Sequence, residues 1–311
     1  MRTLKFLYSC HLVALLCGLV GLVVLAPFSQ LWAGNPLGKA IFQFLLDSSA
    51  TLLILFGAAT MLLFGLLYIG ARKTIIFFAS ATLITLSMEL FGADIGFPFS
   101  ATASTTYPGI KVAGFLSYAV LLSWFYMGFA SYLLANKLAS RLGLRRQTLW
   151  SLSLGAYFLV AWELALNSAM ANVQPSRQAL IWHEYGAYFG MPVRTLLGWT
   201  VNGLVFLCVC RVLWRESLAA HSRVNRATWL PFGVYTANTG LVMLLNIIVG
   251  LWFVSLISAL FVLLPESLVL FPQLETRDAR TGPVRIIFSQ AVWLVIGIGR
   301  RVIAMRSLNP K

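Results

Sequence analysis

The chain has 311 residues, of which 59% are hydrophobic and only 10% are charged, and its mean hydropathy is +0.85. This balance excludes an ordinary soluble domain and predicts an all-α, polytopic integral membrane helical bundle. The formal net charge of +14 would suit a nucleic-acid partner, but the cytoplasmic loops of membrane proteins carry the same excess. The positions of the cations therefore decide between the two.

Apolar runs follow one another along the whole chain, and most are long enough to cross about 30 Å of hydrocarbon as helices. They cover residues 6–26, 50–70, 74–91, 110–135, 148–167, 194–214, 230–249 and 250–271. The first run is too long for the apolar core of a signal peptide, so we expect it to be retained. The last two runs form one stretch twice the length of a span, which predicts a tight hairpin near residues 246–250. About eight spans result, with seven as the alternative.

Charge placement favours eight spans with the N-terminus and the C-terminus both inside. In that topology 19 of the 23 Lys and Arg residues lie inside, and the four outside are Lys39, Lys111, Arg177 and Arg194. A seven-span chain would put the seven cations of the tail outside. The basic charge thus follows the positive-inside rule, and we expect no nucleic-acid partner.

Segments between and after the spans complete the domain organisation. Residues 1–271 are expected to form the transmembrane domain, in which the apolar loop 27–49 could include a short helix on the membrane surface. Residues 272–311 are expected to form a basic cytoplasmic tail, with 284–299 as a possible interfacial helix. The protein is therefore expected in a bacterial inner or plasma membrane, or in a thylakoid membrane.

Two acids fall inside predicted spans. Glu89 and Glu163 each lie about fifteen residues from the inner end of their span, so both reach the outer leaflet at about 1.5 Å per residue. An ionisable side chain within a span is costly and usually faces the interior of the bundle. Both acids are therefore candidate catalytic residues, and an interfacial or capping role is the alternative.

Two outer loops with many aromatic residues lie next to these acids. Their candidates are Asp94, Phe97 and Phe99 after the third span, and Trp182, His183, Glu184 and Tyr188 before the sixth. A belt of aromatic residues at the membrane boundary would explain the Trp and Tyr residues, and a turn would explain Asp94 between two glycines. The adjacent histidine and glutamate favour a functional loop.

Signatures of metal and cofactor sites are missing from the sequence. His183 has no second histidine at ligand spacing, because His11 and His221 are predicted on the inner side. The four cysteines lie in spans without the spacing of a metal site or a disulfide framework, and no Walker loop or nucleophile elbow is present. We expect no metal and no cofactor.

Several motifs in combination resemble the membrane-bound carotenoid 1',2'-hydratases of the CruF type. They are Met-Glu-Leu-Phe-Gly at 88–92, Gly-Phe-Pro-Phe at 96–99, Leu-Ser-Trp-Phe-Tyr-Met-Gly at 122–128, Ala-Trp-Glu at 161–163, Gly-Ala-Tyr-Phe-Gly-Met-Pro at 186–192 and Gly-Trp at 198–199. The resemblance covers roughly residues 50–265. The chain departs from the family pattern at Glu163, commonly Asp, at Asn167, where the family has a second acid, at Arg194, where it has Asn, and at Ser100 and Ala101.

The resemblance implies that water is added to the terminal 1',2' double bond of an acyclic carotenoid end, giving a tertiary alcohol without cofactor or metal. Glu89 or Glu163 would donate the proton, since an apolar pocket keeps a carboxyl group protonated. Aromatic faces would stabilise the tertiary cation, and His183, Glu184 or Asp94 would take the proton from water. Substrate-binding candidates are Phe97, Phe99, Trp124, Trp162, Trp182, Tyr188 and Trp199.

The expected partners are a carotenoid that enters from the bilayer through an opening between the third and fifth spans, the lipid membrane itself, and other enzymes of carotenoid biosynthesis. A small transporter is the alternative from another class, although no inverted repeat is visible. A carotenoid-binding or assembly protein without catalysis is the third hypothesis, and the departures at Asn167 and Arg194 favour it.

Overall fold

The computed structural model describes residues 1–26, 28–95, 102–103, 111–112, 116–172, 181–182, 186, 188–189, 191–214 and 229–263. Within these residues seven helices are long and apolar enough to cross a membrane. They are α1 (Arg2–Val20) with its continuation η1 (Gly21–Leu25), α4 (Ser49–Tyr68), α5 (Ala71–Ile95), α6 (Tyr118–Arg141), α7 (Gln147–Asn172), α8 (Val193–Trp214) and α10 (Trp229–Ile248). The all-α, polytopic membrane bundle predicted from the composition is confirmed.

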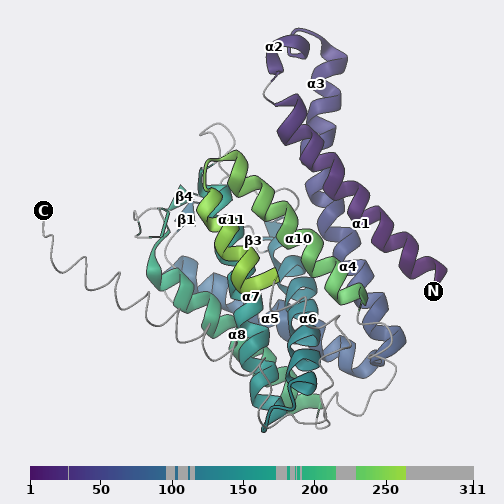
Figure 1. The fold of residues 1–311 in the computed structure, drawn as a ribbon, viewed down its shortest axis with the longest axis vertical. Helices are drawn as coiled ribbons and strands as arrows, with labels where there is room; N and C mark the ends of the chain where they lie inside the picture. The colour runs from purple at the N-terminus through teal and green to yellow at the C-terminus, as the bar shows by residue number, and fades with distance from the viewer. Residues whose placement is uncertain are drawn as a thin grey trace, which may run out of the picture.

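Helices α6 and α7 form the centre of this bundle (Figure 1). Residues of α6 are buried on every side of the helix, whereas α1 is mostly exposed. Helix α8 packs against both α5 and α7, and α10 packs against both α6 and α7. The acids predicted in the third and fifth spans therefore lie on α5 and α7, in a part of the bundle that α8 covers.

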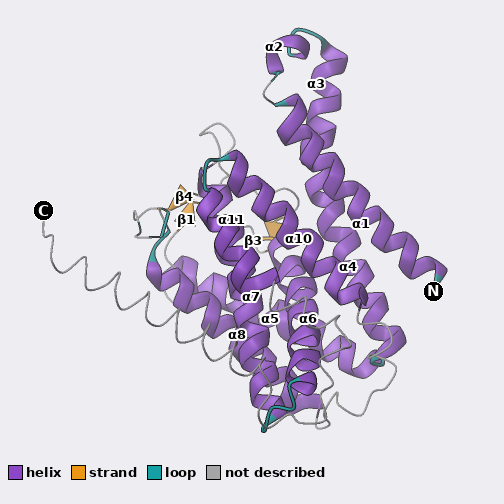
Figure 2. Ribbon diagram, in the orientation of Figure 1, coloured by secondary structure: helices purple, strands orange, loops and turns teal. Residues whose placement is uncertain are grey.

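A helical hairpin extends away from the bundle at the N-terminal end of the chain (Figures 1 and 2). It pairs α1 with α4, and its tip consists of α2 (Ser29–Trp32), α3 (Pro36–Gln43) and the π-helical turn η2 (Phe44–Ser48). Asn35 caps α3 by accepting a hydrogen bond from the Leu37 amide at 2.9 Å. The short helix expected in loop 27–49 is thus present, with Phe28, Leu37, Ile41 and Phe44 exposed.

The hairpin predicted near residues 246–250 is also present. Helix α10 ends at Ile248, Gly250 has a φ of +83°, and the Leu251 amide donates to the Asn246 carbonyl at 2.7 Å. The positive φ favours glycine at this turn. The chain then returns as α11 (Trp252–Ser258) and η5 (Ala259–Leu263), which form the described part of the eighth predicted span. The rest of that span and the tail 272–311 lie outside the described residues.

The two outer loops meet as a short antiparallel pair. Strand β1 (Thr102–Ala103) pairs with β4 (Ile181–Trp182), so the loop after α5 and the loop before α8 lie at the same end of the bundle. Strands β2 (Lys111–Val112) and β3 (Leu116–Ser117) form a second pair where the sequence predicted the start of the fourth span. Helix α6 begins later than predicted because Ser117 caps it, accepting from the Ala119 amide at 3.2 Å.

Candidate active site

Glu163 is held in the interior of the bundle by its own helix. Its side chain is only 6% exposed. The Asn167 side-chain amide donates to the Glu163 carboxyl oxygen Oε2 and to the Glu163 backbone carbonyl, both at 2.8 Å. Residues four apart lie on one face of a helix, which is why α7 brings the two side chains together. The bond therefore holds the carboxyl oxygen Oε2 in place.

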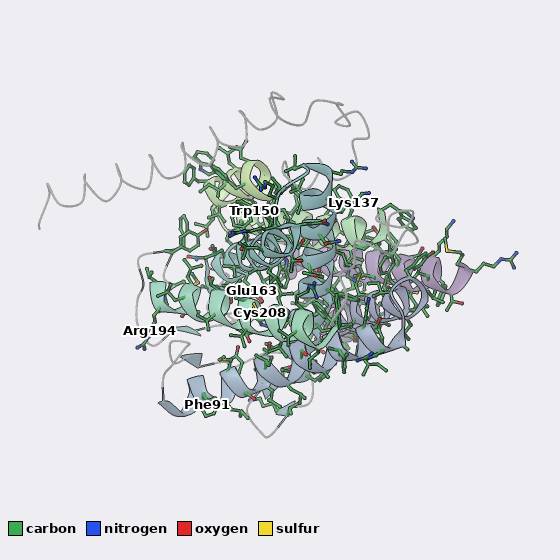
Figure 3. All side chains as sticks on the ribbon, turned by 90° about the horizontal axis from the view of Figure 1, so that it is seen from below. Phe91, Lys137, Trp150, Glu163, Arg194 and Cys208 are labelled. Atoms are coloured by element: carbon green, nitrogen blue, oxygen red, sulfur yellow. The ribbon has the colours of Figure 1, made fainter. Side chains whose placement is uncertain are left out.

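Glu89 lies on α5, which packs, as α7 does, against both α6 and α8. The two carboxyl groups lie within electrostatic range of each other, and the Tyr126 hydroxyl on α6 lies within electrostatic range of Glu163. Figure 3 shows Glu163 within the bundle, whereas Phe91 and Arg194 lie at its periphery. The two acids predicted at one depth are therefore close enough to interact electrostatically.

A polar pair that was not predicted lies one helical turn from Glu89. Thr85 and Asn202 are fully buried, and the Asn202 amide nitrogen Nδ2 donates to the Thr85 hydroxyl at 3.0 Å. The Asn202 oxygen Oδ1 is buried without a hydrogen-bond partner among the described residues. The signal was available in the sequence, because a polar side chain in the middle of an apolar span is as informative as an acid there.

The outer end of α7 is covered by the loop that carries Tyr188. Tyr188 and Met191 exchange backbone hydrogen bonds of 3.4 and 2.9 Å, and the Tyr188 hydroxyl group lies near Ser168, the residue after Asn167. Gly186 permits this turn, because a Cβ atom there would lie 1.9 Å from the Met191 carbonyl oxygen. Burial raises the pKa of Tyr188 against the opposing effect of Ser168, so its hydroxyl stays neutral.

Three of the predicted substrate-binding tryptophans are buried in the bundle. Trp124, Trp162 and Trp199 are 2%, 4% and 6% exposed. Trp124 packs edge-on against Phe206 of α8, with ring centroids 6.3 Å apart. The Trp162 indole nitrogen Nε1 is buried without a hydrogen-bond partner among the described residues. Three aromatic side chains are therefore buried on α6, α7 and α8, the helices that pack around Glu163 and against its helix.

The other predicted site residues are only partly within the described structure. The backbones of Asp94 and Trp182 belong to the last turn of α5 and to β4. Phe97, Phe99, His183 and Glu184 lie outside the described residues. In the described part of the chain no group of three or more His, Cys, Asp or Glu side chains could hold a metal ion.

A second buried polar cluster lies on the α10 side of the bundle, centred on His11. The His11 ring nitrogens bond the Leu53 carbonyl at 2.8 Å and the Asn238 amide nitrogen at 3.1 Å. Asn238 also donates to the Val234 carbonyl, and its oxygen accepts from the Tyr126 hydroxyl at 2.9 Å. His11 was predicted merely on the inner side, but it is buried halfway along α1 and joins four helices.

The departures from the family pattern fall in different places. Asn167 is buried and touches the Glu163 carboxyl group, so this difference alters the immediate surroundings of a candidate acid. Arg194 is exposed in the first turn of α8, at the periphery of the bundle (Figure 3). Asn167 is therefore the departure that bears on chemistry at Glu163.

Fold and site together define a multi-pass helical membrane protein in which Glu163 is buried and Glu89 lies within electrostatic range of it. The model of the carotenoid biosynthesis protein family matches residues 49–265. The chain belongs to this family, and its role is in carotenoid biosynthesis. No curated protein and no solved structure shows a significant match to it.

Proposed function

We propose that this protein is a carotenoid hydratase that adds water to the terminal 1',2' double bond of an acyclic carotenoid end. The observation that supports the proposal is the Glu163 carboxyl group, which is 6% exposed inside the apolar bundle and has Glu89 of another helix within electrostatic range. Carotenoids are hydrocarbon-rich, and a family role in their biosynthesis requires a group that can act on carbon–carbon bonds. A carboxylic acid can do this by protonation.

The reaction would begin with a proton transferred from one carboxyl group to the alkene carbon C2'. This leaves a tertiary cation at C1', and addition of water followed by loss of a proton gives the tertiary alcohol. Two carboxylates close together in hydrocarbon would repel each other strongly, which suits a pair that holds a proton to donate. The second carboxyl group can then act as the base.

The buried tryptophans support the same chemistry. A cation near the face of an indole ring is stabilised by about 1–2 kcal/mol when water is excluded. Trp162 is adjacent to Glu163 in sequence, and Trp124 and Trp199 are buried in the same bundle. These rings would bind the polyene end and stabilise the cation.

The carotenoid would enter sideways from the lipid, because it dissolves in the bilayer and not in water. The entrance is expected between the third and fifth spans, and the corresponding helices α5 and α7 both pack against α8. Helix α8 would therefore form one wall of the entrance.

The test is expression of the chain in a bacterial host that makes acyclic carotenoids, grown in oxygen-18 water, with mass spectrometry of the pigments. The proposal predicts a product heavier by one labelled water, and its loss in Glu163→Gln with the protein still in the membrane. An unlabelled oxygen in the product would indicate an oxygenase. If substrates with several different acyclic end groups gave no product, the hydratase hypothesis would be excluded, and a transporter or a binding protein would be favoured.

A further inference from the structure

We propose that Asn202 and Thr85 bind the water molecule that is added to the carotenoid. This inference rests on the proposed hydratase function, and it assigns a binding site to water, the second substrate of that reaction. A polyene site excludes water, so a hydration reaction inside the bilayer needs a dedicated polar position for one small molecule. The structure contains a pair of side chains with that character next to the acids.

The contacts of Asn202 leave one of its polar atoms unused. Its nitrogen Nδ2 donates to the Thr85 hydroxyl at 3.0 Å, while its oxygen Oδ1 is buried and unpartnered within the described part of the chain. A buried acceptor without a partner costs about 1–3 kcal/mol. Thr85 accepts the bond from Asn202, so its own proton can be donated. One acceptor and one donor side by side are the partners that a buried water requires.

Asn202 and Thr85 differ from other buried polar side chains because they lie close to an acid. Thr85 precedes Glu89 by four residues, so the two side chains lie on the same face of α5. Asn246 also has an unpartnered Oδ1, but its nitrogen donates to the Ala165 carbonyl at 2.8 Å. Ala165 is about 200° around α7 from Glu163, because each residue turns the helix by about 100°. Asn246 therefore belongs to the other side of α7.

This placement assigns different roles to the two acids. A water bound between Thr85 and Asn202 lies beside Glu89, so Glu89 takes the proton that the water loses as its oxygen bonds to C1'. Glu163 then supplies the proton that adds to C2'. One proton leaves Glu163 and one arrives at Glu89, and transfer between the neighbouring carboxyl groups restores the starting state.

The experiment follows the fate of the cation in deuterated water. A cation trapped by water becomes the alcohol, whereas a cation that escapes trapping loses a proton and returns to an alkene that carries deuterium. The purified protein in lipid nanodiscs is supplied with an acyclic carotenoid, and the ratio of deuterated alkene to alcohol is measured. Asn202→Leu and Thr85→Val test the site, and Asn246→Leu is the matched control.

We expect Asn202→Leu to raise this ratio about tenfold, the equivalent of one lost hydrogen bond to the reacting water. Thr85→Val should raise it in the same direction and keeps the test decisive if Asn202→Leu does not fold. Asn246→Leu should leave it unchanged. If Asn202→Leu lowers alcohol and deuterated alkene together, the pair only joins α5 to α8 and the water site is wrong. A wild-type protein with neither product would instead remove the hydratase function itself.

Discussion

The two buried polar clusters of this bundle differ in how completely their hydrogen bonds are satisfied. Around His11, both ring nitrogens and the polar atoms of the Asn238 side chain have partners. Around the acids, Asn202 Oδ1 and Trp162 Nε1 have none among the described residues. Both clusters are buried in the same apolar surroundings, so burial alone does not explain the difference.

This difference indicates different roles. A satisfied network inside a membrane protein joins helices, and each of its bonds contributes modestly to stability. Unpartnered polar atoms beside a pair of acids cost stability and are retained where a substrate completes the bonding. The His11 cluster is therefore a structural centre that holds α1 and α4 to the bundle, and the Glu163 cluster is the candidate centre of chemistry.

Glu163→Gln should distinguish the roles of the two clusters most clearly, because it should lower activity and leave stability unchanged. Loss of the proton donor should lower hydration by about 10²–10⁴-fold, because a general acid contributes that much to a rate. The amide has nearly the same shape and can still pair with Asn167, so thermal stability and pigment binding should change little. Turnover by pigment analysis and unfolding temperature measure the two effects. A stable variant with normal turnover would place the acid elsewhere.

Asn238→Leu is expected to lower stability and to leave the activity of the folded protein nearly unchanged. This change leaves His11 Nε2 and the Tyr126 hydroxyl without their Asn238 partners and should destabilise the fold by about 2–3 kcal/mol. The activity of each folded molecule should remain within a few-fold of wild type. Unfolding in denaturing detergent, compared with turnover per folded protein, tests this. If turnover per folded molecule fell as far as in Glu163→Gln, the His11 cluster would belong to the active site.

An intermediate effect is expected when Asn167 is changed. Asn167→Leu removes the donor to Glu163 Oε2 and frees the carboxyl group to rotate, so kcat should fall about tenfold. Asn167→Gln can restore a donor and should recover part of the loss. KM for the carotenoid should stay near the wild-type value in both variants. A change confined to KM would make Asn167 a substrate contact and not a positioning residue.

The smallest effect is expected at Tyr188. Tyr188→Phe keeps the ring over the end of α7 and removes only the hydroxyl group near Ser168, so activity should fall a few-fold. Burial raises the pKa of this phenol, so folding favours its neutral form and its contribution to stability is lost only above about pH 10. The pH profiles of wild type and variant should therefore run parallel from pH 6 to about pH 9. A divergence within that range would contradict this.

Much of the fold could be predicted because hydropathy and length determine spans directly. The first seven predicted spans overlap α1, α4, α5, α6, α7, α8 and α10, and Glu89 and Glu163 became candidates because acids stand out in apolar runs. The start of α6 was misplaced because Lys111–Val112 and Leu116–Ser117 continue an apolar run in the sequence but form β2 and β3. Periodicity could not show which helices are neighbours.

The pairing of neutral polar side chains could not be predicted either, because the sequence does not show which helices are neighbours. Asn202 and Thr85 lie on different helices, 117 residues apart, and only the packing of α8 on α5 brings them together. His11 and Asn238 are 227 residues apart. Their presence in spans marked them as unusual, but their pairing depends on tertiary structure.

The central claim is that the buried acids hydrate a carotenoid end, and the most direct measurement is turnover by the purified protein. Wild-type protein and Glu163→Gln are placed in lipid nanodiscs with an acyclic carotenoid under nitrogen, with no added cofactor. The account predicts a tertiary alcohol from the wild type and none from the variant, which still retains the pigment. Equal product from both proteins, or no product from the wild type with pigment bound, would contradict it.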